Sequence, residues 1–358
     1  MKAIILKNYI LPVNSKSMNK DRRKTFIVVE GDHERDVLFS FILKCFPEID
    51  LTMDNITIYG SSIYSLYNGI VKEYQADWDQ NGSSIDIPYI ISSIKGIEPK
   101  MRAKDYANII LVFDYERQDT NFSQSNIEKL QKHFDNITDE GILYINYPMI
   151  ESYMDMESIP DDTYFGKKIS SAIKRGHEYK NPVRDRSALL RIINAYGSID
   201  AMLSVRVPAL ELNARTRVIN RMLGAKAESD INTVVQNELD SLNVTEDDAC
   251  YLMNYIPSRV RHIPLSDNSS YYETIREKMI RVIRDNLIKA WCVEQNKSFD
   301  KDGFDLYRMY ITLDMLNLLK RQGQLSCDRS NGSIWVICTV LFFMCEYKVF
   351  WKLVNDET

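Results

Sequence analysis

The chain is poor in the residues that form zinc sites and disulfide frameworks. It has 4 histidines in 358 residues, without the paired spacing of zinc ligands, so no zinc site is expected. Its 6 cysteines lack Cys-x-x-Cys spacing and lie mostly in apolar helical stretches. We therefore expect buried free thiols, which fits a reducing cytoplasm.

No hydrophobic run is long enough to cross a bilayer. The most apolar stretch, residues 334–345, is shorter than the roughly 18 residues that a span requires, and Glu346 and Lys348 follow it directly. We interpret it as a buried core helix and expect no membrane partner. The apolar core of residues 1–7 is too short for a signal peptide, so this stretch is expected to add an edge strand.

Several catalytic motifs are also missing. There is no Gly-rich phosphate loop, no Gly-x-Ser-x-Gly elbow and no Cys-His pair, so P-loop nucleotide hydrolysis and acyl chemistry are unsupported. What is present is a globular composition, with 45% hydrophobic and 11% aromatic residues, and a length that favours two domains. The net charge of −5 means that contact with nucleic acid would need a local basic surface.

A short apolar run at residues 25–29 ends abruptly in Glu30 and a glycine. Its β-branched and aromatic residues and its length predict a buried strand. Residues 32–44 then show apolar residues at helical spacing, so a helix follows and places Glu34 on its first turn. The strand therefore delivers Glu30 to its carboxyl end, where ligands bind in open parallel sheets.

A second buried strand, residues 108–113, ends in Asp114-Tyr-Glu116, with Asp119 close behind. In extended chain residues i and i+2 point to one side, so the Asp114 and Glu116 carboxylates can share one point. Glu30 and Glu34, which follow the first strand, could converge on the same point from the neighbouring strand. Four converging carboxylates need a hard divalent cation to neutralise them, and oxygen ligands suit magnesium, manganese or calcium.

These residues resemble the TOPRIM domain, which topoisomerases, primases, OLD-family nucleases and several phage-defence nucleases share. The resemblance is carried by Glu30-Gly after one strand, by Asp114-Tyr-Glu116 after a later strand, and by a helix after each. Glu34, as in Val-Glu-Gly-x-x-Glu, is more similar to OLD-type nucleases than to topoisomerases. The usual Asp-x-Asp is Asp-Tyr-Glu here, and Gln118 stands where a further Asp would close the triplet.

The resemblance implies two further candidate metal ligands. Asp119 is a candidate substitute for the missing acid, and the site could otherwise have fewer ligands. Defence-associated relatives place a Glu after the next strand in a Pro-x-x-Glu context, which Pro-Met-Ile-Glu151 resembles. The implied metal ligands are Glu30, Glu34, Asp114, Glu116, Asp119 and Glu151. The structural alternative is that acids at strand ends cap helices, and that Glu116 and Arg117 form an ordinary solvated pair.

The rest of the first half alternates strands and helices. Strands are predicted at residues 56–59 and 141–145, and helices at residues 63–74, 85–94 and 123–134. Such alternation indicates a parallel sheet flanked by helices, so we predict a TOPRIM-like α/β domain over residues 25–157. Residues 1–24 are predicted to be an N-terminal strand and connection, and residues 75–106 an insertion around the site.

Beyond residue 157 helical periodicity dominates, which predicts a mainly α-helical domain over residues 158–358. Helices are expected at residues 269–293, 304–319 and 333–353. The first part of this half is basic, and both contact with nucleic acid and plain solvation of helix surfaces would explain that. The candidate nucleic-acid-binding residues are Lys174, Arg175, Arg184, Arg186, Arg215, Arg217 and Arg221.

The predicted function is a metal-dependent endonuclease that hydrolyses phosphodiester bonds in RNA or DNA. The predicted catalytic residues, which would hold magnesium or manganese, are Glu30, Glu34, Asp114 and Glu116. A Lys or Arg would assist electrostatically, and the candidates are Arg35, Arg117 and the basic stretch of residues 174–221.

The resemblance also implies partners. OLD-type and phage-defence relatives commonly act with an ABC-type ATPase, and this sequence has no ATPase motif, so the ATPase would be a separate subunit. The chain is therefore the expected effector of an anti-phage defence system, and a homo-oligomer is a further expectation. The alternative is a non-catalytic nucleic-acid-binding or regulatory subunit with a degenerate TOPRIM site.

Overall fold

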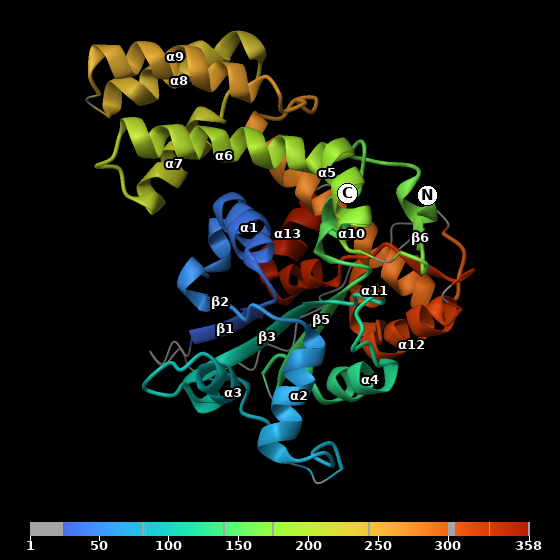
Figure 1. The fold of residues 1–358 in the computed structure, drawn as a ribbon. Coiled ribbons are helices and arrows are strands. Elements are labelled where there is room, and N and C mark those ends of the chain that lie inside the picture. The colour runs from blue at the N-terminus through green and yellow to red at the C-terminus, as the bar shows by residue number, and fades with distance from the viewer. Residues whose placement is uncertain are drawn as a thin grey trace, which may run out of the picture.

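A five-stranded sheet forms the centre of the first half of the chain (Figure 1). The computed structural model describes residues 24–356, apart from residues 81, 83, 139, 174, 243, 300–304 and 329. The strands, in sheet order, are β2 (Ile56–Ile58), β1 (Lys24–Val29), β3 (Tyr106–Asp114), β5 (Gly141–Asn146) and β4 (Asp135–Asn136). All neighbours pair in parallel except β4, which pairs antiparallel with β5. The strand predicted at residues 1–7 and the candidate Lys174 lie outside the described residues.

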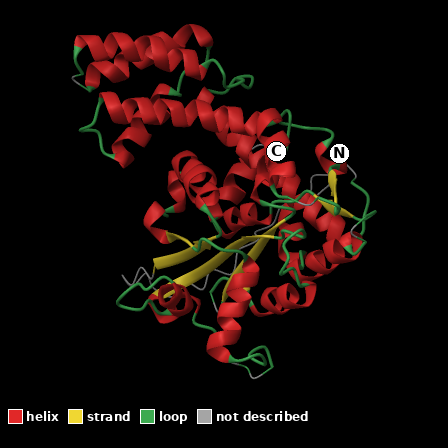
Figure 2. Cartoon of the chain, viewed as in Figure 1, coloured by secondary structure: helices red, strands yellow, loops and turns green. Residues whose placement is uncertain are grey.

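The central strands β1 and β3 are continuous apolar runs because helices cover both faces of the sheet. Figure 2 shows these helices on either side of the strands. The side chains from Thr25 to Val29 and from Ile109 to Asp114 are buried. The predicted class, a mostly parallel α/β sheet flanked by helices, is confirmed. Strand β4 was not predicted, because two residues carry no periodic signal.

The helices of this half follow the predicted order. They are a helix that runs through His33–Phe39 into α1 (Ser40–Cys45), and α2 (Ile63–Tyr74), α3 (Ile87–Ile94) and α4 (Gln124–His133). The Ser123 side chain caps α4 by accepting a hydrogen bond from the Asn126 amide at 3.4 Å. One detail differs from the prediction: the first helix is wound as a wider π-helix over His33–Phe39, and this is the segment that carries Glu34.

The second half of the chain is mainly helical, as predicted. Its helices are α5 (His177–Arg186), α6 (Ala188–Arg206), α7 (Leu212–Met222), α8 (Ile231–Ser241), α9 (Glu246–Val260), α10 (Tyr271–Glu294), α11 (Leu306–Thr312), α12 (Met315–Ser326) and α13 (Lys348–Asp356). Helices α6 to α9 form an arm at the top of the view in Figure 1. A small antiparallel sheet of β6 (Lys168–Ser170) and β7 (Ser333–Trp335) was not predicted.

The long helix predicted over residues 333–353 is wrong. The chain there forms β7, an extended segment, a 3₁₀ helix at Thr339–Glu346 and then α13. Side chains far away in sequence take the backbone amides that a helix would have used. Asn286 accepts from the Cys338 amide at 2.7 Å, and Asn146 accepts from the Val340 amide at 3.3 Å. The apolar stretch at residues 334–345 is buried, as predicted, but it is not a regular helix.

The helix predicted over residues 304–319 is also wrong in its extent. It is divided into α11 and α12, because the Asp314 side chain caps α12 by accepting a hydrogen bond from the Asn317 amide at 2.9 Å. The end of the chain returns to the sheet, where the Thr339 hydroxyl donates to the carbonyl of Ile145 at 2.8 Å. Residues of the second half therefore complete the core of the first, and the division at residue 157 stays a prediction.

Among the described residues, one helix is long and apolar enough to span a membrane by length and composition alone, and it is α6. Core helices of soluble proteins pass the same test. The Phe41 ring of α1 contacts the Tyr196 ring of α6, and Asp200 of α6 forms an ion pair with Lys44 of α1 at 2.8 Å. Helix α6 thus packs against the helix that leads away from β1.

Candidate metal centre

Three carboxylates converge at the carboxyl ends of β1 and β3. Glu30 directly follows β1, Asp114 is the last residue of β3, and Glu116 lies two residues further on. Each offers a ligand oxygen, and these oxygens all lie within 4.8 Å of one another. The Asp114 amide also donates to the Glu30 carboxylate at 3.2 Å. The parallel pairing of Val29 with Val112 explains the meeting, because it aligns the ends of the two strands.

We call Glu30, Asp114 and Glu116 the carboxylate trio. Their meeting was predicted, but not the backbone that produces it. Glu116 has a φ of 35°, in the left-handed region that a long side chain rarely adopts, instead of the extended conformation expected from the spacing of two. Its amide donates to the Pro148 carbonyl at 3.2 Å. Such strain costs about 1–3 kcal/mol and is typical of functional sites.

Glu34 lies against the trio from the π-helical turn. It is 3% exposed, and its carboxylate accepts a hydrogen bond from the Gly31 amide at 3.1 Å. Burial raises the pKa of Glu34 to about 7. Its charge in turn raises the pKa of Glu30 and of Asp114. Glu34 is therefore electrostatically part of the site, although it is outside the set of oxygens that lie within 4.8 Å of one another.

The carboxylates are held in an environment that disfavours their negative charge. Burial, followed by the charges of Glu116 and Glu34, raises the pKa of Glu30 to about 8. Burial and the charge of Glu30 raise the pKa of Asp114 well above its ordinary value. Burial also raises the pKa of Glu116. A nearby cation would relieve this repulsion and restore the ionised forms.

The donor set of the trio fits a hard divalent cation. All of its donors are carboxylate oxygens, which magnesium, manganese and calcium prefer. Oδ1 of Asp114 is buried and has no hydrogen-bond partner within the part of the chain that the structure describes. A buried carboxylate oxygen without a donor needs a compensating group. The acidic cluster of Glu30, Asp114 and Glu116 could therefore hold a metal ion.

Glu151 faces the site from the 3₁₀ turn at Ile150–Met154 and is fully buried. Two residues of α5 pair with it: Nη2 of Arg184 lies 2.8 Å from its Oε1, and Nζ of Lys180 lies 3.7 Å from its Oε2. It lies near enough for its charge to raise the pKa of Glu116 and Asp114. The structure therefore places Glu151 beside the trio, paired with cations.

Lys180 is the basic residue at the site. Burial lowers its pKa, but the charges of Asp114, Glu151 and Glu116 outweigh burial and raise it. Lys180 lies inside the basic stretch of residues 174–221 that was a candidate for this role, but it was not among the predicted nucleic-acid-binding residues. The Arg117 guanidinium instead lies 4.1 Å from the centre of the Phe122 ring, and Arg35 pairs with Asp36 at 3.8 Å. Only the fold of α5 onto the turn at Glu151 distinguishes Lys180 from its basic neighbours.

Asp119 does not join the trio. Its carboxylate accepts a hydrogen bond from the Asn121 amide at 2.7 Å, so it caps a local turn. Its charge still raises the pKa of Glu116. His33, the first residue of the π-helical segment, is half-buried at the site. Its Nε2 lies 3.4 Å from the Tyr153 hydroxyl, and burial lowers its pKa.

The predicted nucleic-acid-binding residues do not form one surface. Arg175, Arg184 and Arg186 lie on or next to α5, while Arg215, Arg217 and Arg221 lie on α7. Figure 1 shows α5 and α7 at opposite ends of α6, whose 19 residues span about 28 Å. Four of these arginines are also paired with acids, as Arg184 with Glu151, Arg186 with Asp155, Arg215 with Asp200 and Arg221 with Glu238.

Comparisons of this chain with protein-family models, with curated proteins and with solved structures found no match. The class of the protein is therefore stated from its fold and site. It is an α/β protein with a mostly parallel sheet and a helical C-terminal region. Three converging carboxylates at the carboxyl edge of that sheet could hold a metal ion.

The raised carboxylate pKa values predict how the stability of the metal-free protein depends on pH. The pKa of Glu30 is raised from 4.5 to about 8, so the folded state holds a proton that the unfolded state loses. The stabilising effect of this proton is complete below pH 4.5. It declines as the pH rises from 4.5 and is lost as the pH passes through about 8. We expect the free energy of unfolding in chelator to fall by a few kcal/mol (roughly 1.4 per pKa unit) over this interval.

The measurement is urea unfolding of chelated protein from pH 5 to 9, with Glu30→Gln as the comparison. The variant should show a shallower decline, because its side chain does not titrate. His33 acts in the opposite direction, since its lowered pKa makes stability rise with pH, but it is present in both proteins. Identical pH profiles for the two proteins would contradict the pKa assigned to Glu30.

Proposed function

We propose that the protein is a metal-dependent nuclease that hydrolyses phosphodiester bonds in RNA or DNA. The observation that carries the proposal is the convergence of Glu30, Asp114 and Glu116 at the carboxyl edge of the sheet, with Lys180 facing them. The resemblance to TOPRIM domains supports it. In that domain the strand-borne Glu and the later acidic pair belong to one site, and here they follow adjacent parallel strands.

Magnesium or manganese is the proposed cofactor, held by the trio with Glu34 as an additional acid beside it. When bound, such an ion supplies charge neutralisation and Lewis acidity for phosphodiester hydrolysis. The protein provides a pre-formed set of oxygens: the Asp114 amide fixes the Glu30 carboxylate, and the Gly31 amide fixes that of Glu34. Glu151, which pairs with Arg184 and Lys180, orients these two cations instead of serving as a principal ligand.

Lys180 is the proposed electrostatic partner of the substrate phosphate. Its charge lies among carboxylates, so it can donate to a phosphate oxygen that approaches the trio, where negative charge develops during hydrolysis. Arg184 forms the shorter ion pair with Glu151, at 2.8 Å against 3.7 Å for Lys180. The nucleic acid would reach the site along α5, and not along α7, whose basic residues lie beyond the far end of α6.

The resemblance to OLD-type and phage-defence proteins suggests the biological setting. We propose a cytoplasmic effector of an anti-phage system that works with a separate ABC-type ATPase, and self-association is part of this proposal. The sequence has no Gly-rich phosphate loop that would bind ATP itself. RNA, including transfer RNA, is as suitable a target as DNA.

The test is cleavage by the full-length chain, alone and with candidate ATPase partners. Labelled single-stranded RNA, transfer RNA, single-stranded DNA and duplex DNA are incubated with Mg²⁺, with Mn²⁺ or with chelator. We expect cleavage of at least one substrate that depends on the cation. Cleavage that continues in chelator would reject the metal dependence. No cleavage of any substrate in any combination would reject the nuclease assignment.

The second candidate function is a non-catalytic binding or regulatory subunit. It is favoured by one specific observation: the site cations Lys180 and Arg184 are already paired with Glu151. It is also consistent with a Glu at position 116, where the family pattern has Asp. Saturable binding of nucleic acid without cleavage, in all of the combinations above, would support this alternative.

A further inference from the structure

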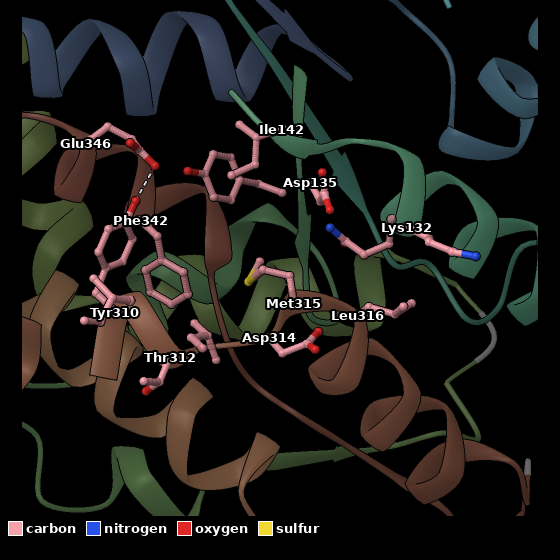
Figure 3. Close-up of a pocket in the computed structure, with 14 residues that line it drawn as sticks. Lys132, Asp135, Ile142, Tyr310, Thr312, Asp314, Met315, Leu316, Phe342 and Glu346 are labelled. Carbon is pink, nitrogen blue, oxygen red and sulfur yellow. Dashed lines mark hydrogen bonds between the residues drawn. The ribbon is translucent and has the colours of Figure 1, made fainter. Parts of the chain in front are cut away.

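A cavity of about 680 Å³ lies away from the carboxylate trio, between α4, β5, the turn from α11 to α12, and the 3₁₀ helix at Thr339–Glu346 (Figure 3). Its walls come from segments that are more than 150 residues apart in the chain. Small-molecule sites typically measure about 300–1,000 Å³. None of the trio lines this cavity, so it is a separate feature of the molecule.

Two polar side chains in the wall of the cavity are buried without a full set of partners. Gln131 is 2% exposed and Tyr144 is 1% exposed. Nε2 of Gln131 donates to the Leu143 carbonyl at 3.1 Å, which fixes the amide, but its Oε1 has no hydrogen-bond partner among the residues that the structure describes. The same holds for the Tyr144 hydroxyl. Buried polar atoms of this kind are rare, and the packing of the wall leaves these two almost no accessible surface.

The charged side chains in the wall of the cavity are mainly negative. Asp135, Asp314 and Glu346 line it, against Lys132 as the one cation among its described lining residues. Glu346 accepts a hydrogen bond from the Tyr310 hydroxyl, which is the dashed line in Figure 3. Asp314 is engaged in capping α12, so Asp135 and the second oxygen of Glu346 are the carboxylate groups available to a ligand.

Aromatic rings stand beside the carboxylate of Glu346. Figure 3 shows Tyr310, Phe342 and Glu346 together at one end of the cavity, with Lys132 and Asp135 at the other. A carboxylate next to aromatic faces is the environment that binds organic ammonium and guanidinium groups, through ion pairing and cation–π attraction. Burial, and then the charge of Glu346, raises the pKa of Tyr144 well above its ordinary value, so its hydroxyl stays protonated.

We propose that this cavity binds a small organic cation, an amine or guanidinium compound with a short apolar body. The ligand's N–H groups would donate to Asp135 and to Glu346, and its apolar part would lie against Phe342 and Tyr310. A nucleotide or other phosphate compound is disfavoured because carboxylates outnumber the cation in the wall. A purely apolar ligand is disfavoured because it would take water away from Asp135 and Glu346 without pairing their charges.

The test is isothermal titration calorimetry of the full-length chain with agmatine and with spermidine as the probes, and with adenosine monophosphate as an anionic control. We expect saturable binding of at least one of the two cations and none of the nucleotide. Glu346→Gln and Asp135→Asn should each weaken that binding about tenfold, the usual effect of losing one charge-assisted contact. Both residues are on the surface side of the cavity and exposed, so the variants should fold, which circular dichroism checks.

Asp267→Asn is the matched control, because it removes the same kind of charge from an exposed position that does not line the cavity. It should bind as the wild type does. An Arg-containing tetrapeptide distinguishes a free cation from the side chain of a protein partner. Binding of the peptide alone, equal binding by all variants, equal binding of the nucleotide, or no binding of either cation would each overturn the proposal.

Discussion

Asp114→Asn is expected to lower Mg²⁺-dependent cleavage on the order of 10³-fold, because it removes a charged ligand from the centre of the trio. Asp114 is 2% exposed, lies within 4.8 Å of both Glu30 and Glu116, and has an oxygen that no described residue satisfies. Asparagine keeps the shape of the side chain but offers a neutral and weaker oxygen ligand. Single-turnover cleavage rates, with Mg²⁺ varied, measure the effect.

Asp119→Asn is the matched control for this variant. It makes the same chemical change five positions away, in a residue that caps a local turn, and should alter the rate by only a few-fold. The metal-free Asp114→Asn protein should be at least as stable as the wild type at pH values where Asp114 is ionised, because one buried negative charge is gone. Equal losses of activity in the two variants would contradict the assignment of Asp114 as a ligand.

Lys180→Met is expected to lower the cleavage rate about 10²-fold, the usual effect of losing one group that stabilises charge in a transition state. Its affinity for Mg²⁺ should be unchanged or higher, because the variant lacks a positive charge that faces Asp114, Glu116 and Glu151. This combination separates Lys180 from the metal ligands, whose loss lowers metal affinity. Calorimetric titration with Mg²⁺ and single-turnover cleavage give the two readouts.

Lys95→Met serves as the control, because Lys95 is exposed at the end of α3 and belongs to no described part of the site. Lys180→Arg should restore part of the lost activity, since it returns the charge with different geometry. A Lys180→Met protein that cleaves at the wild-type rate would refute the proposed role, whatever its affinity for Mg²⁺.

The strand and helix pattern of the first half could be predicted because each signal is local. The apolar runs before Glu30 and before Asp114 are short, β-branched and followed by helical periodicity, and this is sufficient to indicate parallel strands. From parallel strands it follows that the acids lie at one edge of the sheet. The sequence was therefore sufficient to predict the meeting of Glu30, Asp114 and Glu116.

The path of the C-terminal segment could not be predicted, because its apolar composition suits a buried helix equally well. Its irregular backbone is set by Asn286 and Asn146, which bind the Cys338 and Val340 amides from other elements. The backbone of residues 333–353 is therefore set by tertiary hydrogen bonds and not by local helix propensity. The same is true of Glu116, whose left-handed backbone has no signature in Asp-Tyr-Glu.

In the first half of the chain, the sequence by itself determined the order of the parallel strands and their helices and the presence of acids at two strand ends, because periodicity and residue type are local properties. The tertiary structure decided which basic residue faces those acids. Arg215 and Arg221 have the same charge as Lys180, but they lie at the far end of α6, while α5 folds onto the turn that carries Glu151. Charge proximity depends on distances across the fold, which spacing along the chain does not encode.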